Sequence, residues 1–353
     1  MKEINKTFLH ILIVLLFPTV LCAQEVTLFK QHNMKRWGIP AGNYSGITNI
    51  SADRYALVSD KQDVDGWMEV SIGFLSSDDI NKVQFVTQHS ANQTLGKARD
   101  SEGIAYVPKQ GFFIGAENDQ QILGFSENGA TSGKALSVPA CFSKSNIFSN
   151  YGFESLTYNK EKGIFWTTTE QGLRTDVSAP SSPENPQPTL LRLQSFDGNL
   201  KPLHQFAYKT DAPQVKHTGR HYAFGVSEML VVNDTTLLVM ERELNIPQNY
   251  NRAKCYIRIY SVNPERHQPI ADTSKPLSQL DASAFLPKKL VCEFSTGFRI
   301  LGKKNLANYE GMCLGPKLPD GRQTILLVSD SQNRAGKAFF HLKDYIKALD
   351  FRP

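Results

Sequence analysis

The feature that most constrains this chain is a short pattern that occurs five times along it. In each copy a pair of small or acidic residues opens an apolar segment, a turn follows, and a second apolar segment ends on an acidic residue. The copies begin near Tyr44, Ser101, Phe153, Ser227 and Tyr309, and they end on Asp60, Glu117, Glu170, Glu241 and Asp330. A hairpin repeated at intervals of about 50 to 80 residues is typical of a radial β-architecture. We therefore expect the acidic residues, which share one phase, to converge on one place.

Alternating and β-branched runs dominate the rest of the chain, so we predict an all-β fold. Each repeat extends outward into a four-stranded blade, which gives a β-propeller of five blades. A sixth blade is the alternative, because segment 263–308 is long and weakly patterned. The only two stretches with a helical period are Ser76–Val83 and Lys343–Leu349. In the second blade we place the fourth strand at Ala135–Pro139.

The last blade is one strand short in the sequence pattern. Its third strand is predicted at Lys337–Leu342, and Glu25–Gln31 at the other end of the chain has the alternation of a strand. Pairing the N- and C-terminal strands would close the ring and remove two exposed sheet edges.

The N-terminal segment has the pattern of a secretory signal peptide. Lys2 and Lys6 precede an apolar run, Phe8–Leu21, that is too short to span a membrane comfortably. We predict a signal peptide at 1–23, a single domain at 24–353, and a secreted or periplasmic location. Lipid attachment at Cys22 is the alternative, although the large Leu21 stands where that signal uses a small residue. No other segment is predicted to cross a bilayer.

Charge and cysteine content exclude several classes of protein. Lys and Arg number 39 against 34 Asp and Glu, without a dense basic run, so we expect no nucleic-acid partner. No Cys-x-x-Cys pair is present, which argues against a structural zinc site. Cys255 and Cys292 lie in segments that could be neighbouring strands, either as a disulfide or as free buried thiols. The oligomeric state cannot be read from these patterns.

The acids of the repeats are the candidate metal ligands. In a propeller the first strand of each blade runs beside the central channel, and the second strand returns to the same end. The candidates on the first strands are Glu102, Glu154, Glu228 and Glu310. The second-strand acids Asp60, Glu117, Glu170, Glu241 and Asp330 are possible further ligands. Like charges this close raise one another's pKa steeply, and a divalent cation relieves the repulsion. Oxygen ligands favour Ca²⁺, with Mg²⁺ as an alternative; the competing interpretation is that the acids cap turns.

Basic residues beside the same positions are candidates for binding an anionic group of a substrate. They are Lys61, Arg99, Arg174, Arg220, His221 and Arg242. The alternative is that each one pairs with its acidic neighbour. No hydrolase signature, phosphate-binding loop or dinucleotide fingerprint is present, so no catalytic residue is identified from a motif.

Several phrases of the sequence resemble one known family. They are Arg99-Asp-Ser-Glu-Gly-Ile-Ala-Tyr106, Asn150-Tyr-Gly-Phe-Glu-Ser-Leu-Thr-Tyr158, Asn308-Tyr-Glu-Gly-Met312 and Leu327-Val-Ser-Asp-Ser-Gln-Asn333, together with Asn43-Tyr-Ser-Gly-Ile47 and Val58-Ser-Asp-Lys61. They occur in the order expected for the secreted phytase-like family, described as having "esterase-like activity of phytase", over roughly residues 40–342. The resemblance implies an exported β-propeller that handles phosphate esters with calcium. Of the functional residues that the resemblance implies, only the glutamates can be assigned to positions of this chain, as candidate metal ligands.

Together these observations predict an exported, metal-dependent phosphoesterase or esterase that acts on a small anionic ester by metal-assisted attack of water. A lactone or sugar-ester hydrolase with the same site differs only in substrate. The alternative from another class is a non-catalytic binding propeller with a structural cation, which recognises a sugar, a peptide or a protein partner, because the fold alone supports both.

Overall fold

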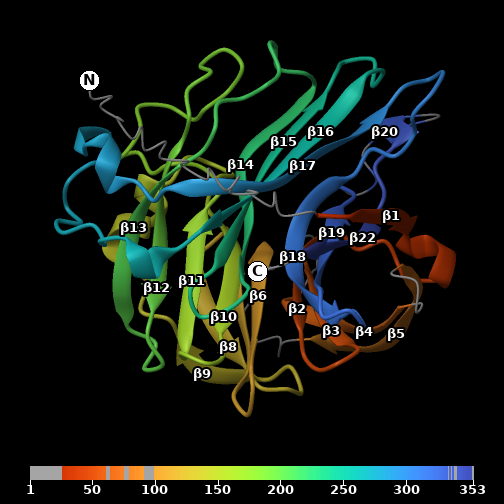
Figure 1. The fold of residues 1–353 in the computed structure, drawn as a ribbon, viewed down its shortest axis with the longest axis horizontal. Coiled ribbons are helices and arrows are strands. Elements are labelled where there is room, and N and C mark those ends of the chain that lie inside the picture. Colours follow the sequence, from red (N-terminus) through yellow and green to blue (C-terminus); the bar gives the residue numbers. More distant parts are fainter. Residues whose placement is uncertain are drawn as a thin grey trace, which may run out of the picture.

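The computed structural model describes residues 26–60, 64–74, 79–90, 99–332, 334, 336–337 and 340–351. The predicted signal peptide, Cys22 and Lys61 lie outside these residues. Five four-stranded antiparallel sheets stand in a ring, so the predicted β-propeller of five blades is confirmed (Figure 1). Among the described residues, no helix is long and apolar enough to cross a membrane.

The blades follow one another along the chain, each with its first strand innermost. Blade 1 consists of β2 (Tyr44–Asn49), β3 (Arg54–Ser59), β4 (Gly66–Phe74) and β5 (Ile80–Ser90). Blade 2 consists of β6 (Ser101–Val107), β7 (Gly111–Ala116), β8 (Gln121–Phe125) and β9 (Thr131–Ala135). Blade 3 consists of β10 (Phe153–Asn159), β11 (Ile164–Thr169), β12 (Leu190–Phe196) and β13 (Pro202–Lys209). Blade 4 consists of β14 (His221–Val231), β15 (Leu237–Ile246), β16 (Ala253–Val262) and β17 (Lys288–Phe298).

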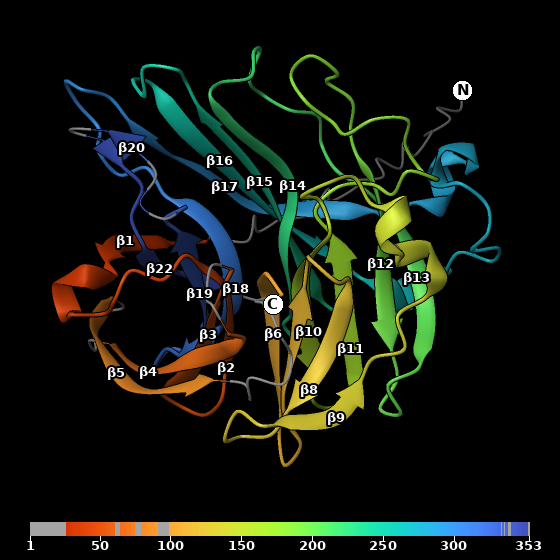
Figure 2. The ribbon, with the colours of Figure 1, turned by 180° about the vertical axis from the view of Figure 1, so that it is seen from behind.

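Blade 5 closes the ring with both ends of the chain. Its strand order is β18 (Asn308–Lys317), β19 (Gln323–Asp330), β22 (Tyr345–Phe351) and then β1 (Leu28–Asn33). Figures 1 and 2 show β1, in red, beside the blue C-terminal strands. The predicted closure by the N-terminal strand is therefore confirmed. The inner strands β2, β6, β10, β14 and β18 contact one another around the axis.

Four predicted elements of secondary structure differ from the described ones. In the predicted helix Lys343–Leu349, residues from Tyr345 onward belong to the strand β22, which lies between β1 and β19 and is buried on both faces, so that its alternation is hidden. Of the predicted strand Lys337–Leu342, the described residues form no blade strand; β20 (Gly336–Lys337) and β21 (Phe340–His341) pair in a separate two-stranded sheet. The fourth strand of blade 2 is β9 rather than Ala135–Pro139, since this outer strand is mostly exposed and carries no apolar signal. Of the other predicted helix, Ser76–Val83, the described residues from Ile80 onward belong to β5.

The thiols of blade 4 are free. Cys255 lies opposite Thr296, and Cys292 lies opposite Ile259, so β16 and β17 pair in a register that separates the two cysteines. The interpretation as free thiols therefore holds, and the disulfide does not form in the structure.

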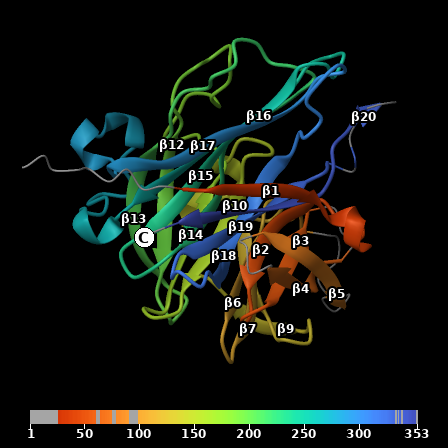
Figure 3. The same ribbon diagram turned by 45° about the vertical axis from the view of Figure 1, so that its right-hand side comes forward.

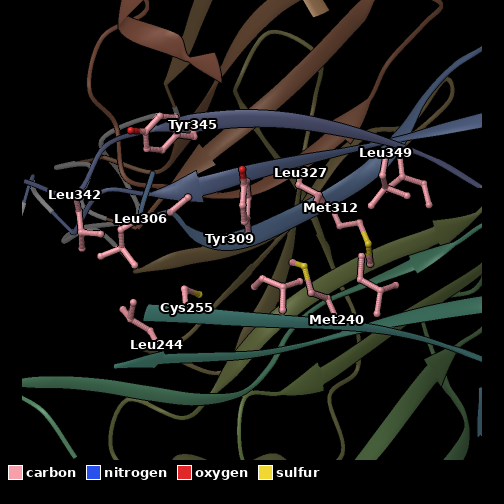
Figure 4. Close-up of a cluster of buried hydrophobic side chains, with 14 of the residues drawn as sticks. Met240, Leu244, Cys255, Leu306, Tyr309, Met312, Leu327, Leu342, Tyr345 and Leu349 are labelled. Atoms are coloured by element: carbon pink, nitrogen blue, oxygen red, sulfur yellow. The ribbon is translucent and has the colours of Figure 1, made fainter. Parts of the chain in front are cut away.

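Apolar side chains fill the spaces between neighbouring blades. Figure 4 shows one such interface, where Met240, Leu244 and Cys255 of blade 4 face Tyr309 and Met312 of blade 5. These side chains are almost fully buried. Burial of this kind, repeated between blades, supplies the main favourable term that holds the ring together.

Segment 263–287, which we call the strap, takes the place of the alternative sixth blade. It contains three short 3₁₀ turns, η5 (Pro264–Arg266), η6 (Leu277–Gln279) and η7 (Ala282–Ala284). Elsewhere among the described residues lie the 3₁₀ turns η1 (Met34–Trp37), η3 (Ala140–Phe142) and η4 (Lys144–Asn146). The strap runs from blade 4 to the outer edge of blade 3, where its Leu286 N–H donates to Ala207 O at 2.8 Å in β13 (Figure 1). It thereby covers an edge strand that would otherwise offer unpaired backbone groups.

A buried ion pair anchors the strap to blade 3. The Arg192 guanidinium binds both carboxylate oxygens of Asp176 at 2.7 Å, and it also donates to the carbonyls of Thr273 and Lys275 at 2.8 and 2.9 Å. The Asp176 carboxylate in turn accepts the N–H of Leu277 at 2.9 Å. Both charged side chains are almost fully buried, so each one needs the other to offset the cost of burying its charge.

We expect Asp176→Ala to lower the free energy of unfolding by about 3–5 kcal/mol, because it leaves a buried guanidinium without its partner. Urea unfolding followed by tryptophan fluorescence measures the loss. The matched control is Glu265→Ala, which removes an exposed strap-to-blade pair with Lys162 at 2.9 Å and should cost less than about 1 kcal/mol. Similar small losses in both variants would contradict the anchoring role.

Candidate functional site

A β-bulge near the start of each inner strand defines the site. The pairing of the first two strands of every blade skips one residue at the same place. The skipped residues are Ser45, Glu102, Glu154, Ser227 and Glu310. A bulge leaves one residue unpaired and re-aims its side chain. Three of these five positions therefore carry a glutamate at the same level of the ring.

The return strand brings a second charged position to the same level. It lies opposite the residue that is two places before the bulge, as in the pairing of Asn308 with Asp330 and of Gly225 with Arg242. The five residues at this position are Asp60, Glu117, Glu170, Arg242 and Asp330. Four blades thus contribute an acid and blade 4 contributes an arginine.

Blade 4 differs by one residue from the phase that the sequence pattern predicts. The register places Ser227, not Glu228, at the bulge, and it places Arg242, not Glu241, at the second position. Glu228 therefore occupies the position of Gly46, Gly103 and Gly311 in other blades, where a Cβ would come within about 3 Å of a neighbouring strand's backbone.

Glu228 and Glu241 both lie away from the other acids. The Glu228 carboxylate accepts the N–H of Met229 at 2.9 Å and hydrogen bonds from the backbone of Leu156 and Met312, so it links β14 to the inner strands on either side. The Glu241 carboxylate accepts hydrogen bonds from Tyr208 Oη at 2.7 Å and from Lys288 Nζ at 2.6 Å, between blades 3 and 4. Neither residue lines the axial cavity.

The remaining acids meet in a cavity of about 590 Å³ at the end of the ring where the inner strands begin. Its acidic lining comprises Asp60, Glu102, Glu117, Glu154, Glu170 and Glu310. Arg242 lies among them, and Arg220, His221, Tyr151 and Tyr222 complete the polar wall. Asp330 adds a further carboxylate close to Glu310 and Asp60. The convergence of the repeated acids, apart from the two in blade 4, is thus present in the structure.

Glu102 and Glu154 are the least compensated of these carboxylates. Each side chain is nearly buried, and no described residue donates a hydrogen bond to it or forms an ion pair with it. Burial, followed by the charges of Asp60 and Glu310, raises the pKa of Glu102 well above its usual value. Burial, followed by the charge of Glu102, does the same for Glu154. Buried acids without a partner are costly, and a bound cation would remove that cost.

Arg242 compensates the opposite side of the cavity. Its Nη2 lies 3.0 Å from a Glu170 oxygen and 3.3 Å from a Glu310 oxygen, and Asn308 donates to the same Glu310 oxygen at 2.7 Å. Burial nevertheless raises the pKa of Glu170 to about 8, and the guanidinium works against that rise.

Three carboxylates form a compact group that could hold a metal. Oxygens of Asp60, Asp100 and Glu102 all lie within 4.8 Å of one another. Asp100 was not among the predicted ligands, although it directly precedes the repeated Ser-Glu-Gly phrase. Its backbone is in the left-handed region, at φ 63°, which turns the chain just before the bulge. An all-oxygen donor set of this kind fits Ca²⁺ or Mg²⁺.

The predicted substrate-binding cations fall into two groups. Arg220 and His221 line the cavity from the exposed end of β14. Arg99 instead binds Asp65 and Asp119, which joins blade 1 to blade 2, and Arg174 stacks on the Phe148 ring at 4.2 Å outside the cavity. Arg220 and His221 reach the cavity because the strands of blade 4 are long and extend beyond the other blades (Figure 3).

The fold and the site together define a β-propeller with an acidic axial cavity. The chain belongs to the phytase-like family, since the family model described as "Esterase-like activity of phytase" matches residues 39–332. This confirms the family resemblance of the sequence phrases. No curated protein matches the chain.

Solved structures give a more distant likeness. A streptogramin B lyase is 11% identical, with 93% of this chain and 98% of that chain covered at a TM-score of 0.36. Virginiamycin B lyase from Staphylococcus aureus is 13% identical, with 93% and 100% covered at a TM-score of 0.36. A PQQ-bound aldose sugar dehydrogenase from Streptomyces coelicolor is 9% identical, with 93% and 98% covered at a TM-score of 0.34.

The raised pKa values predict how stability depends on pH. A carboxyl that is more basic when folded stabilises the protein fully below its unfolded pKa, and this contribution is lost as pH rises through the folded pKa. For Glu170 these limits are 4.5 and about 8, and Glu102, Glu154 and Asp330 shift in the same direction. We therefore expect the free energy of unfolding, measured with urea in the presence of chelator, to fall between pH 4.5 and 8. Calcium should remove most of the decline, and a stability that rises over this range would contradict the assignment.

Proposed function

We propose that the protein is an exported ester hydrolase that depends on a divalent cation and acts on a phosphoric or carboxylic ester. The observation that carries the proposal is the pair Glu102 and Glu154, two nearly buried carboxylates that face a solvent-connected cavity without a hydrogen-bond donor among the described residues. The family description adds the reaction class, an esterase-like activity of phytase. Export is part of the proposal and is supported by the apolar segment Phe8–Leu21.

A cation fits the donor set better than any side chain that the cavity contains. Arg242 is shared between Glu170 and Glu310, and no described residue forms an ion pair or hydrogen bond with Glu102 or Glu154. Asp60, Asp100 and Glu102 would hold the ion, and calcium is our first choice because only oxygen ligands are present. When bound, such an ion supplies charge neutralisation and polarises an ester oxygen.

Glu170 is suited to accept a proton during hydrolysis. Its carboxylate lines the cavity, and a pKa of about 8 places its protonation change near neutral pH, where a general base is most effective. Arg242, 3.0 Å from one Glu170 oxygen, orients the carboxylate. Glu170 can therefore take a proton from an attacking water at the other oxygen and return it to the leaving group.

The rim of the cavity is suited to bind the rest of the substrate. Arg220 and His221 are exposed and can contact an anionic group, while Leu244 and Ile246 of the long blade 4 hairpin offer an apolar wall. The arrangement fits a small ester that carries one anionic or polar end and one organic group. A polyanion fits poorly, since acids outnumber the basic groups in the lining.

The direct test is hydrolysis of p-nitrophenyl phosphate and p-nitrophenyl acetate by the mature protein, with calcium and with chelator. We expect calcium-dependent turnover that Glu102→Gln and Glu154→Gln each lower about 100-fold or more, because several kcal/mol of transition-state stabilisation depend on the ion. Glu170→Gln should lower kcat with little change in KM.

Glu265→Gln, in the exposed part of the strap, is the matched control and should leave turnover unchanged. If neither ester is hydrolysed and chelator only lowers the melting temperature, the hydrolase is refuted. The ion would then be structural, in a propeller that binds a sugar, peptide or protein partner.

The rim predicts a second effect, on substrate binding alone. We expect Arg220→Gln to raise KM for the phosphate ester about tenfold and to leave KM for the uncharged acetate ester nearly unchanged, because one charge-assisted hydrogen bond is worth about 1.5 kcal/mol. Steady-state kinetics on both esters measure the difference. Equal changes for the two esters would show that Arg220 does not contact the anionic group.

A further inference from the structure

One position of the acidic ring is occupied by a cationic side chain. Asp60, Glu117, Glu170 and Asp330 follow the same register in four blades, and Arg242 takes that register in the fifth. The substitution places a permanent positive charge at the level where the other blades place a negative one, since a guanidinium does not lose its proton in proteins.

The surroundings of Arg242 are those of a bound cation. It is 3% exposed, and its Nη2 bridges Glu170 and Glu310 at 3.0 and 3.3 Å. Glu154 is the next acid whose charge acts on it. A single positive centre shared by carboxylates of blades 3 and 5 is the arrangement that a metal ion would adopt at this place.

Arg242 also keeps unused hydrogen-bonding capacity inside the cavity. Its Nε and Nη1 are buried and have no hydrogen-bond partner among the described residues, although the side chain lines the cavity. Charge balance, rather than a saturated hydrogen-bond network, therefore explains why a guanidinium stands there.

On the other side of the cavity, no described residue places a cationic group in contact with Glu102. Asp60, Asp100 and Glu102 bring their oxygens within 4.8 Å of one another at the junction of blades 1 and 2. Glu102 is 7% exposed and forms no ion pair or hydrogen bond with a described residue. An uncompensated buried carboxylate within a group of potential ligands points to an external cation.

We propose that Arg242 is a built-in cation that occupies one half of the acidic cavity and so confines a single divalent cation to Asp60, Asp100 and Glu102. This inference rests on the cation site of the proposed function and adds the number of ions and their location. Removal of the guanidinium charge should open a second cation site at Glu170 and Glu310, because those two acids lose their shared counter-charge.

Isothermal titration of the chelator-treated mature protein with calcium chloride tests the stoichiometry without reference to activity. We expect one ion for the wild type and two for Arg242→Gln. Arg242→Lys, which keeps the charge, should bind one ion, as should the rim control Arg220→Gln. If the wild type and Arg242→Gln both bind one ion, the inference is overturned while the proposed function stands. If the wild type binds two, the confinement is wrong.

A second pair of variants locates the ion even if Arg242→Gln fails to fold. Asp100→Asn keeps a residue that tolerates the left-handed backbone and removes one ligand charge, so calcium affinity should fall at least about tenfold. Glu170→Gln should leave affinity within about twofold, because the cation lies on the other side of the cavity. The reverse result would overturn the inference. If the wild type binds no calcium, the cation of the proposed function fails, and the inference fails with it.

Discussion

Repulsion among buried carboxylates at the propeller axis is the constraint on which the rest of the structure depends. Oxygens of like charge a few ångströms apart in a site of reduced dielectric cost several kcal/mol, unless protons, an arginine or a cation compensate them. The ring tolerates this cost because ion pairs and hydrogen bonds outside the acidic cavity join its blades. Arg99 joins blades 1 and 2, Arg192 fastens the strap to blade 3, and Tyr208 with Glu241 joins blades 3 and 4. The favourable contacts between blades thus offset the unfavourable repulsion among the buried carboxylates at the axis.

Blade 4 converts a nearly symmetric ring into a site with two different sides. Its inner hairpin carries Arg242 in place of an acid, and its long strands add Arg220 and His221 to one wall of the cavity. Glu228 contributes at a deeper level, where its carboxylate binds the backbone of Leu156 and Met312. Those two residues also line a separate cavity of about 250 Å³ toward the other end of the inner strands. Glu228 therefore helps to separate the acidic cavity from the opposite mouth.

The sequence pattern was sufficient for the architecture and for most of the site because both depend on the same repeat. The hairpin phase predicted five blades, and Glu102, Glu154 and Glu310 lie at the predicted mouth. Blade 4 was predicted one residue out of phase. Ser227-Glu228 has the same residue types as Ser101-Glu102, but the bulge falls on Ser227 in blade 4 and on Glu102 in blade 2. A bulge is a property of the register between two strands, and a single strand's sequence does not specify it. Asp100 lies outside any strand, so the strand pattern of the sequence did not indicate it as a candidate ligand.

In the proposed function, protons and a divalent cation would compete for the same oxygens of this cavity. Burial and neighbouring charges raise the pKa of Glu102 and of Glu154, so both keep their protons to a higher pH than an exposed carboxyl would. Binding of a divalent ion must release protons from whichever carboxylates ligate it, so cation affinity increases with pH. Arg242 limits how many protons the empty cavity retains, because its fixed charge lowers the pKa of Glu170 relative to an otherwise identical ring of acids. The arginine thus reduces the number of protons that the acids bind, and under the proposed function it would also reduce the number of cations that they need.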